Sequence, residues 1–370
     1  MIPVNEPLLG ERELANVTEC VRTGWISSAG HFIEEFEARW AEYCGQRYGV
    51  AVSNGTVALQ IAAACLDLKP GDEVIMPAFT IISCAQAVIY SGGVPVLVDA
   101  DPHTWCMDVS QVADKITPRT RAIMPVHIYG HPVNMRPLWD LAQSHGLKII
   151  EDAAEAHGAR CYGQRCGGLG DLSCFSFYAN KIVTTGEGGM VLTNDAGYAE
   201  RARSLRNLCF RPERRFYHTE LGFNFRLTNL QAAIGLAQVE RVDELVAAKQ
   251  RMGQRYNELL AGIPGLALPV QEPWATNVYW MYGLVLDEGT GLDAVEFARR
   301  LRERGVETRP FFLGLHEQPV LQAAGLFHGE RYPVSERIAR QGLYLPSGLA
   351  LTDEQMERVA AAVREALGRR

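Results

Sequence analysis

The 370-residue chain lacks several patterns that mark membrane, secreted or metal-ribbon proteins. None of its nine cysteines form the C-x-x-C pairs typical of zinc ribbons and thiol redox motifs. No apolar run approaches the roughly 18 residues that a membrane-spanning helix needs. Residues 1–10 have neither a basic start nor an apolar core, so we expect no signal peptide and no membrane partner. We therefore expect reduced thiols and a cytoplasmic location.

An excess of positive charge is also missing. The chain has 36 Lys and Arg against 43 Asp and Glu, a formal net charge of -7. A general nucleic-acid binder would show a basic stripe or a high pI, so we expect no nucleic-acid partner. A phosphate-bearing small ligand is still compatible, because a site needs only local positive potential.

The first two thirds of the chain alternate short apolar runs with amphipathic stretches. Apolar strands separated by helices predict an α/β domain whose mainly parallel sheet is covered on both faces. The later strands follow one another closely, which favours an antiparallel part of that sheet. We expect strands at 49–53, 72–77, 95–99, 122–129, 148–152, 172–178 and 188–193, and helices at 57–68, 83–91 and 136–145.

The last third reads as a connecting helix and a smaller α/β section. Residues 228–262 have the apolar spacing of one long helix, and three prolines follow it. A strand at 278–286 and helices at 292–305 and 353–367 come next, with Thr352 as N-cap of the last. We therefore predict a large domain with an N-terminal arm at 1–240 and a small C-terminal domain at 241–370.

Two segments at predicted strand ends can contact a phosphorylated cofactor. Ser53-Asn54-Gly55-Thr56 joins a strand to a helix N-terminus, where backbone N–H groups attract phosphate. Taken alone, this segment is equally an ordinary turn and N-cap. The strand at 148–152 delivers acids, Glu151 and Asp152, at its carboxyl end, where a carboxylate can keep the pyridine nitrogen of pyridoxal phosphate protonated. Taken alone, these acids and Glu155 are helix-capping residues.

A third segment supplies a lysine. Lys181 follows an apolar strand, and a lysine in a desolvated site has a lowered pKa and a reactive neutral amine. Ser176, five residues earlier, can donate to a phosphate. Taken alone, a lysine after a strand is usually a solvent-exposed residue of a loop. The order of phosphate turn, acid and lysine across successive strand ends favours one shared cofactor site.

These segments resemble the DegT-type sugar aminotransferases, which have the aspartate-aminotransferase fold (fold type I of the pyridoxal-phosphate enzymes). The resemblance covers nearly the whole chain. It is carried by residues 23–28, 53–56, 151–158, 180–181, 186–189, 222–229, 231–233, 279–282 and 308–312. Residues 126–132 and Glu155 are most similar to the branch that makes GDP-perosamine by aminating carbon 4 of a GDP-linked 4-keto-6-deoxy sugar.

The resemblance implies a role for each matching residue. Lys181 would bind pyridoxal 5'-phosphate covalently and move protons, and Asp152 would pair with its ring nitrogen. Glu155 would lie near the ring and its 3-hydroxyl. The phosphate would be held by Gly55, Thr56 and Ser176, and by Asn224 from the neighbouring subunit of a homodimer with shared active sites.

Two positions discriminate within the family. Some relatives are sugar dehydratases with a histidine in place of Lys181, so the lysine implies transamination, with glutamate as amino donor. Many relatives carry an aromatic residue on the cofactor ring where this chain has Ile81. Ile81 could cover the ring only by apolar contact.

Weaker candidates surround this core. Five arginines between residues 206 and 226 could approach a nucleotide diphosphate, or form a surface loop or a subunit contact. From this region and the C-terminal part we select Arg226, Tyr279 and Arg309 as candidate contacts of a nucleotide-linked keto sugar. His127 and His131 lack a third ligand at suitable spacing, so we expect no metal.

Two alternative functions stay open. The acceptor could be a dTDP- or UDP-linked 3- or 4-keto sugar. The chain could also be a regulator that keeps the fold without turnover. A nicotinamide-dependent oxidoreductase is disfavoured, because no G-x-G-x-x-G follows an early strand.

Overall fold

The computed structural model describes residues 1–211 and 213–368. Its larger part contains a seven-stranded sheet in the order β1-β9-β8-β5-β4-β2-β3. Five neighbouring strands run parallel, whereas β9 is antiparallel to both β8 and β1. This confirms the predicted mainly parallel sheet. The strands are β1 (Tyr48–Val52), β2 (Glu73–Pro77), β3 (Val94–Val98), β4 (Thr120–Ile123), β5 (Lys148–Asp152), β8 (Leu172–Ser176) and β9 (Gly189–Thr193).

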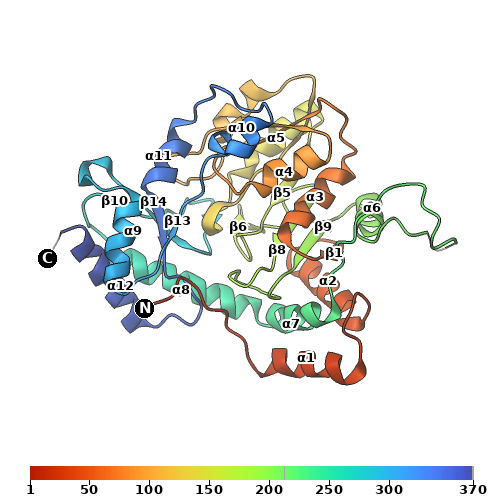
Figure 1. Ribbon diagram of the computed structural model, residues 1–370, viewed down its shortest axis with the longest axis horizontal. Coiled ribbons are helices and arrows are strands. Elements are labelled where there is room, and N and C mark those ends of the chain that lie inside the picture. The colour runs from red at the N-terminus through yellow and green to blue at the C-terminus, as the bar shows by residue number, and fades with distance from the viewer. Residues whose placement is uncertain (212, 369–370) are drawn as a thin grey trace.

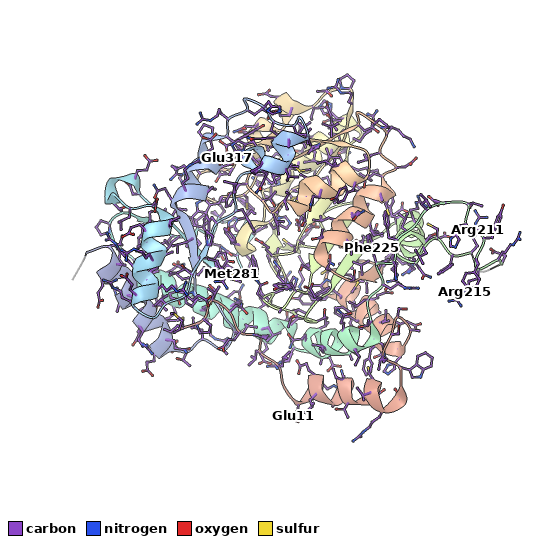
Figure 2. The ribbon with its side chains drawn as sticks, viewed as in Figure 1. Glu11, Arg211, Arg215, Phe225, Met281 and Glu317 are labelled. Atoms are coloured by element: carbon purple, nitrogen blue, oxygen red, sulfur yellow. The ribbon has the colours of Figure 1, made fainter. Side chains whose placement is uncertain are left out.

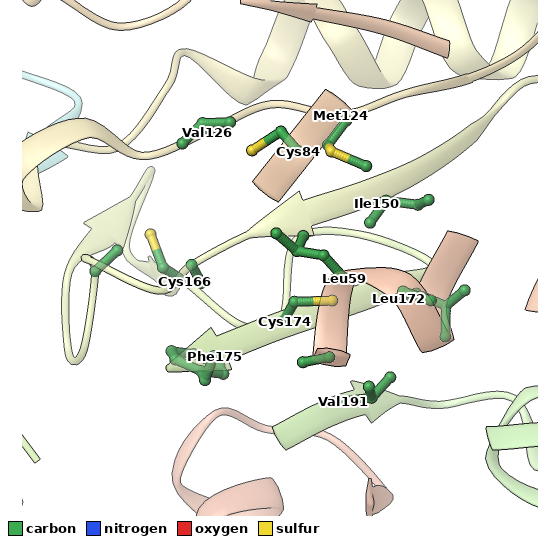
Figure 3. Packing of buried hydrophobic residues seen from close by; sticks show 14 of the residues in the cluster. Leu59, Cys84, Met124, Val126, Ile150, Cys166, Leu172, Cys174, Phe175 and Val191 are labelled. Atoms are coloured by element: carbon green, nitrogen blue, oxygen red, sulfur yellow. The ribbon is translucent and has the colours of Figure 1, made fainter. Parts of the chain in front are cut away.

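Helices cover both faces of this sheet, as the apolar strands predict. Figure 1 shows α3 and α4 on one side of the strands and α2 and α7 on the other. Leu59 of α3 packs with Ile150, Leu172 and Val191 of three neighbouring strands (Figure 3). All nine cysteines are buried and free. The helices are α1 (Glu11–Thr23), α2 (His31–Tyr43), α3 (Gly55–Cys65), α4 (Ser83–Tyr90), α5 (Met135–His145), α6 (Ala196–Arg206) and α7 (Asn229–Glu240).

A second core forms in the C-terminal part around a four-stranded sheet of order β10-β12-β14-β13. Thr352 caps the last helix, as predicted, by accepting the Gln355 N–H at 3.2 Å. The strands are β10 (Leu266–Ala267), β12 (Tyr282–Leu286), β13 (Arg309–Pro310) and β14 (Gly342–Leu345), and a small separate sheet contains β6 (Arg160–Cys161), β7 (Gln164–Arg165) and β11 (Ala275–Thr276). The helices are α8 (Val242–Leu260), α9 (Ala294–Glu303), α10 (Pro319–Ala323), α11 (Pro333–Gln341) and α12 (Asp353–Ala366).

The single helix predicted at 228–262 is wrong, because the structure has two. Arg241 leaves the helical region (φ -123°, ψ 20°) and separates α7 from α8. The apolar period continues across this residue, so the sequence pattern does not reveal the break. Along α8, Val246 packs in the first core and Met252 in the second. The domain boundary at 240/241 stays a prediction.

Two predicted strands are also too long. The strand at 122–129 ends at Ile123, and Tyr129 adopts a positive φ of 52°. The strand at 278–286 begins only at Tyr282, after Tyr279 with a φ of 49°. A positive φ interrupts the extended backbone, and hydrophobicity does not encode it. In the described ranges, no helix is both long and apolar enough to cross a membrane.

Candidate active site

A pocket of about 630 Å³ opens where β5 and β8 end and α3 begins. Pockets of this size suit cofactors and small ligands. Because parallel strands end at one edge of the sheet, separate sequence segments meet there. Trp280, Phe312 and Tyr344 line the pocket from the C-terminal part of the chain. The predicted residues that the structure brings together in it are Gly55, Thr56, Asp152, Glu155, Ser176 and Lys181.

One end of the pocket is rich in hydrogen-bond donors. Asn54 caps α3 by accepting the Val57 N–H at 3.0 Å. In residues 1–211 and 213–368, no protein group accepts the N–H of Gly55 or Thr56. The Thr56 Oγ1 lies 2.9 Å from the Ser83 Oγ. A helix N-terminus with free N–H groups and adjacent hydroxyls fits a phosphate.

Gly55 permits a close approach to the next strand end. A Cβ at this position would lie 2.6 Å from the Ser176 Cβ and 3.2 Å from its Oγ. Any side chain at residue 55 would therefore push Ser176 away from the helix N-terminus. The small residue keeps both phosphate-binding candidates at one end of the pocket.

Asp152 presents a buried carboxylate to the pocket. Its Oδ1 accepts the Ala154 N–H at 3.0 Å, and its Oδ2 accepts the Cys84 thiol at 3.3 Å. Burial raises the pKa of Asp152, and the hydrogen bond from Ala154 opposes this shift. A fixed, poorly hydrated carboxylate gains strongly from a positively charged partner. The protonated ring nitrogen of pyridoxal phosphate is such a partner.

The preceding acid has a different environment. Strand alternation turns Glu151 away from Asp152, and its Oε1 lies 3.0 Å from the His127 Nε2. Burial raises the pKa of Glu151, but its hydrogen bonds outweigh that effect and lower the pKa overall. Its other donors are the Gly167 N–H, the Leu169 N–H and the Ser173 hydroxyl. We assign Glu151 a structural role.

A buried group of His127, Glu151 and Cys166 has the residue types of a metal site. The Val133 N–H donates to the His127 Nδ1 at 3.0 Å, so Nε2 carries the ring proton toward Glu151. Both ring nitrogens are thus engaged in hydrogen bonds. The structure therefore gives no argument for a metal here, and the expectation of none stays a prediction.

Lys181 is buried in the pocket with an acid and an aromatic ring beside it. Its Nζ lies 3.9 Å from the Glu155 Oε1 and 3.4 Å from the centroid of the Trp280 ring. Burial lowers the pKa of Lys181, although Glu155 and Asp152 act in the opposite direction. The amine is therefore more available in its neutral, nucleophilic form than a solvated lysine.

Glu155 is the second titratable group beside that amine. Its Oε2 accepts the Tyr129 N–H at 2.8 Å, which leaves Oε1 facing Lys181. Burial raises the pKa of Glu155 to about 7, against the opposing effect of Lys181. Glu155 therefore changes charge near neutral pH, next to the reactive amine.

Four predicted residues lie outside this pocket. Tyr279 packs in the second core close to Gly253, and the Arg309 Nη1 pairs with Glu307 at 2.7 Å. Asn224 is exposed, and Arg226 donates to the Asn207 Oδ1 at 2.8 Å. A second pocket of about 540 Å³ contains Arg203, Arg206, Arg211, Arg215 and Arg226. Figure 2 shows Arg211 and Arg215 on a loop at the edge of the molecule.

The sequence interpretation missed several residues that line or support the site. Trp280 is adjacent to the selected Tyr279, which has a positive φ of 49°, and the Trp280 ring rather than the Tyr279 ring reaches Lys181. Ser83 and Cys84 carry no sequence signal beyond their place after β2. Ile81 lines the pocket and is 45% exposed, so an aliphatic side chain lies at the position where the family resemblance led us to expect an aromatic ring.

Comparison with known sequences identifies the family. Residues 7–364 match the DegT/DnrJ/EryC1/StrS aminotransferase family. A GDP-perosamine synthase of Caulobacter vibrioides is 44% identical over 367 residues, which are 99% of this chain and 98% of that protein. A dTDP-3-amino-3,4,6-trideoxy-alpha-D-glucose transaminase of Streptomyces venezuelae is 39% identical over 338 residues, 91% of this chain and 87% of that protein.

Solved structures show the same architecture. The aminotransferase TlmJ from Streptoalloteichus hindustanus superposes with a TM-score of 0.92 at 34% identity, covering 100% of this chain and 99% of that one. This likeness confirms the predicted fold class, that of the fold-type-I pyridoxal-phosphate transferases. The matched family spans nearly all of the sequence, including every segment that lines the pocket. The chain belongs to the DegT/DnrJ/EryC1/StrS aminotransferase family.

Proposed function

We propose that the protein uses pyridoxal 5'-phosphate to move an amino group from glutamate to carbon 4 of a GDP-linked 4-keto-6-deoxy sugar. The observation that carries the chemistry is the buried Lys181 amine beside Glu155, in one pocket with the Asp152 carboxylate. The acceptor is proposed from similarity, because the relative that is 44% identical is named GDP-perosamine synthase.

The donors and charges of the pocket fit the cofactor. Gly55, Thr56 and Ser176 would hold its phosphate, and Asp152 would pair with its ring nitrogen. Glu155 would lie near the ring and its 3-hydroxyl. When bound, the cofactor supplies an electron sink for the carbon that loses or gains the proton.

Lys181 carries out the proton transfers in this proposal. Its lowered pKa leaves the amine free to accept a proton from a substrate carbon. Glu155, at 3.9 Å, then stabilises the ammonium that results. Trp280, Tyr344 and Ile81 line the pocket around the amine and limit the entry of water.

The residues outside the pocket fit a role across a subunit boundary. Arg226 lines an arginine-rich pocket apart from the pocket of Lys181, and the exposed Asn224 forms a β-bridge with Asn207, another residue of that arginine-rich pocket. We propose a homodimer in which Asn224 reaches the phosphate of the cofactor bound by the other subunit. Arg226 and Arg309 are proposed contacts of the sugar nucleotide, whereas Tyr279 stays a sequence prediction, because its side chain packs in the second core.

A panel of keto sugar nucleotides tests the acceptor. The purified enzyme, with glutamate as donor, is offered GDP-, dTDP- and UDP-linked 4-keto-6-deoxy sugars, and amino sugar is measured by mass spectrometry. We expect the GDP-linked sugar to give the highest kcat/KM. The 39% identical dTDP-sugar transaminase supports the second candidate. Efficient turnover of a dTDP or UDP sugar, with none of the GDP sugar, would overturn the acceptor assignment.

Replacing Glu155 with glutamine is expected to lower the pH at which Lys181 captures the cofactor. The negative charge of Glu155 raises the pKa of Lys181, so its removal leaves more neutral amine at a given pH. The difference from the wild type should grow as the pH rises through about 7, where Glu155 ionises. The measurement is the rate at which apoprotein develops the visible cofactor band, from pH 6 to 9.

The exposed variant Glu35→Gln is the control for this substitution. Its pH profile should match that of the wild type. An unchanged or higher midpoint in Glu155→Gln would contradict the proposed pairing of Glu155 with Lys181.

A further inference from the structure

Lys249 is a lysine in the protein interior. It lies on α8, where its residue is 1% exposed. No carboxylate of the described residues pairs with the Lys249 amine. Its Nζ donates instead to the Trp280 carbonyl oxygen at 2.7 Å and to the Ser347 carbonyl oxygen. Lysine is among the residues least often buried without a paired charge, so this one requires an explanation.

Hydrogen bonding explains the burial of Lys249 better than charge pairing does. Burial lowers the pKa of Lys249 to about 7. Both the neutral amine and the ammonium have at least two N–H donors, so either form satisfies two carbonyl groups. Without those donors, two buried carbonyl oxygens would lose their partners, which is costly.

The first carbonyl belongs to the residue that covers Lys181. The Trp280 ring centroid lies 3.4 Å from the Lys181 Nζ, and the Trp280 Nε1 donates to the Asn180 carbonyl oxygen at 2.8 Å. Trp280 is thus fixed at its backbone by Lys249 and at its indole by the residue before Lys181.

The second carbonyl belongs to Ser347, which bonds to both the C-terminal sheet and the N-terminal arm. The Ser347 Oγ accepts the Tyr282 N–H at 2.9 Å, and the Ser347 N–H donates to the Val4 carbonyl oxygen at 2.8 Å. Asn5, the next residue, donates from its Nδ2 to the same Asn180 carbonyl oxygen at 3.3 Å. Lys249 therefore links Trp280 to Ser347, which bonds to the N-terminal arm. Both Trp280 and the arm donate hydrogen bonds to Asn180, the residue before Lys181.

We propose that Lys249 is a positioning residue that holds Trp280 over Lys181 and so keeps the reactive amine away from water. It acts through Trp280 and does not touch the pocket itself. The inference extends the proposed function, because it concerns the environment of the lysine assigned to catalysis there.

Loss of the Lys249 donors is expected to raise the pKa of Lys181. If Trp280 loses its backbone anchor, water reaches Lys181, and the desolvation that lowers the pKa of Lys181 is relieved. Losing the ring also removes a cation–π attraction, which would shift the proton equilibrium the other way by about thirtyfold. Full desolvation shifts it by roughly a thousandfold or more. The relief of desolvation is therefore larger than the loss of the cation–π attraction, and we expect the pKa of Lys181 to rise.

The test is Lys249→Met, which replaces the lysine with an unbranched side chain one atom shorter and removes the donors. Tyr256→Phe is the matched control, because the Tyr256 hydroxyl on the same helix donates to the adjacent Pro346 carbonyl oxygen at 2.9 Å. Full-length apoprotein is labelled with an acetylating reagent across pH 6 to 11, and Lys181 acetylation is followed by peptide mass spectrometry. We expect the Lys249→Met midpoint to rise by about one pH unit, a tenfold loss of neutral amine.

Tyr256→Phe should lose stability but keep the wild-type midpoint. A Lys249→Met protein that is less stable yet titrates Lys181 like the wild type would show a purely structural lysine and overturn the proposal. If Lys249→Met does not fold, Lys249→Gln keeps two N–H donors on a shorter chain and should give a smaller upward shift. The labelling needs no cofactor, so failure of the proposed function would be seen separately, as absence of a cofactor band in the wild type.

Discussion

Replacing Lys181 with alanine is expected to lower kcat at least about ten-thousandfold. The substitution removes both the amine proposed to bind the cofactor and the group proposed to move protons between carbons. No other lysine lines the pocket in the described part of the chain, so no neighbour replaces it. The rate of amino sugar formation from glutamate, at saturating cofactor, measures the effect.

Lys148→Ala is the matched control for this variant. Lys148 is 47% exposed and pairs with Asp171 at the opposite end of β5. Its loss should leave kcat within about twofold, since exposed ion pairs contribute little. A Lys181→Ala protein that keeps more than about one hundredth of the wild-type rate would show that another group carries the proton.

Replacing Asp152 with asparagine is expected to lower kcat about a hundred- to a thousandfold. Asparagine keeps the size of the side chain and an oxygen for the Ala154 N–H, but it removes the negative charge. Without that charge, the ring nitrogen loses its proton and the electron sink weakens. Stopped-flow measurement of the glutamate half-reaction isolates this step from binding of the sugar.

Asp140→Asn on the exposed face of α5 controls for the change of charge. Both variants should keep a thermal unfolding midpoint within a few degrees of the wild type. If the Asp152→Asn protein carried out the glutamate half-reaction at the wild-type rate, Asp152 would not be the partner of the ring nitrogen. Glu151 would not replace it, because its carboxylate is already bonded to His127 and Ser173 on the other side of β5.

The order of strands and motifs was enough to predict which large-domain segments converge. Parallel strands end at one edge, so the residues after β1, β5 and β8 had to meet there. The structure places Thr56, Asp152 and Lys181 around one pocket, as that topology requires. The choice of Asp152 over Glu151 came from the family resemblance. The structure accounts for it, because side chains alternate along a strand and Glu151 is bonded to His127 on the other side.

Other features depend on contacts that local patterns do not encode. Trp280 reaches Lys181 from more than ninety residues away, and it follows a positive φ at Tyr279 that local patterns do not encode. The break at Arg241 is one non-helical residue inside a continuous apolar period. Asn224 and Arg226 lie outside the pocket of their own chain, so their proposed roles depend on a second subunit.

The visible absorption spectrum of the purified protein, before and after adding glutamate, tests the central claim most directly. The account predicts a band from lysine-bound cofactor that bleaches with glutamate and returns when a GDP-linked 4-keto-6-deoxy sugar is added. Lys181→Ala should lack the wild-type band. A protein that shows no such band even after incubation with pyridoxal phosphate would contradict the account, and a regulatory role for the fold would then be favoured.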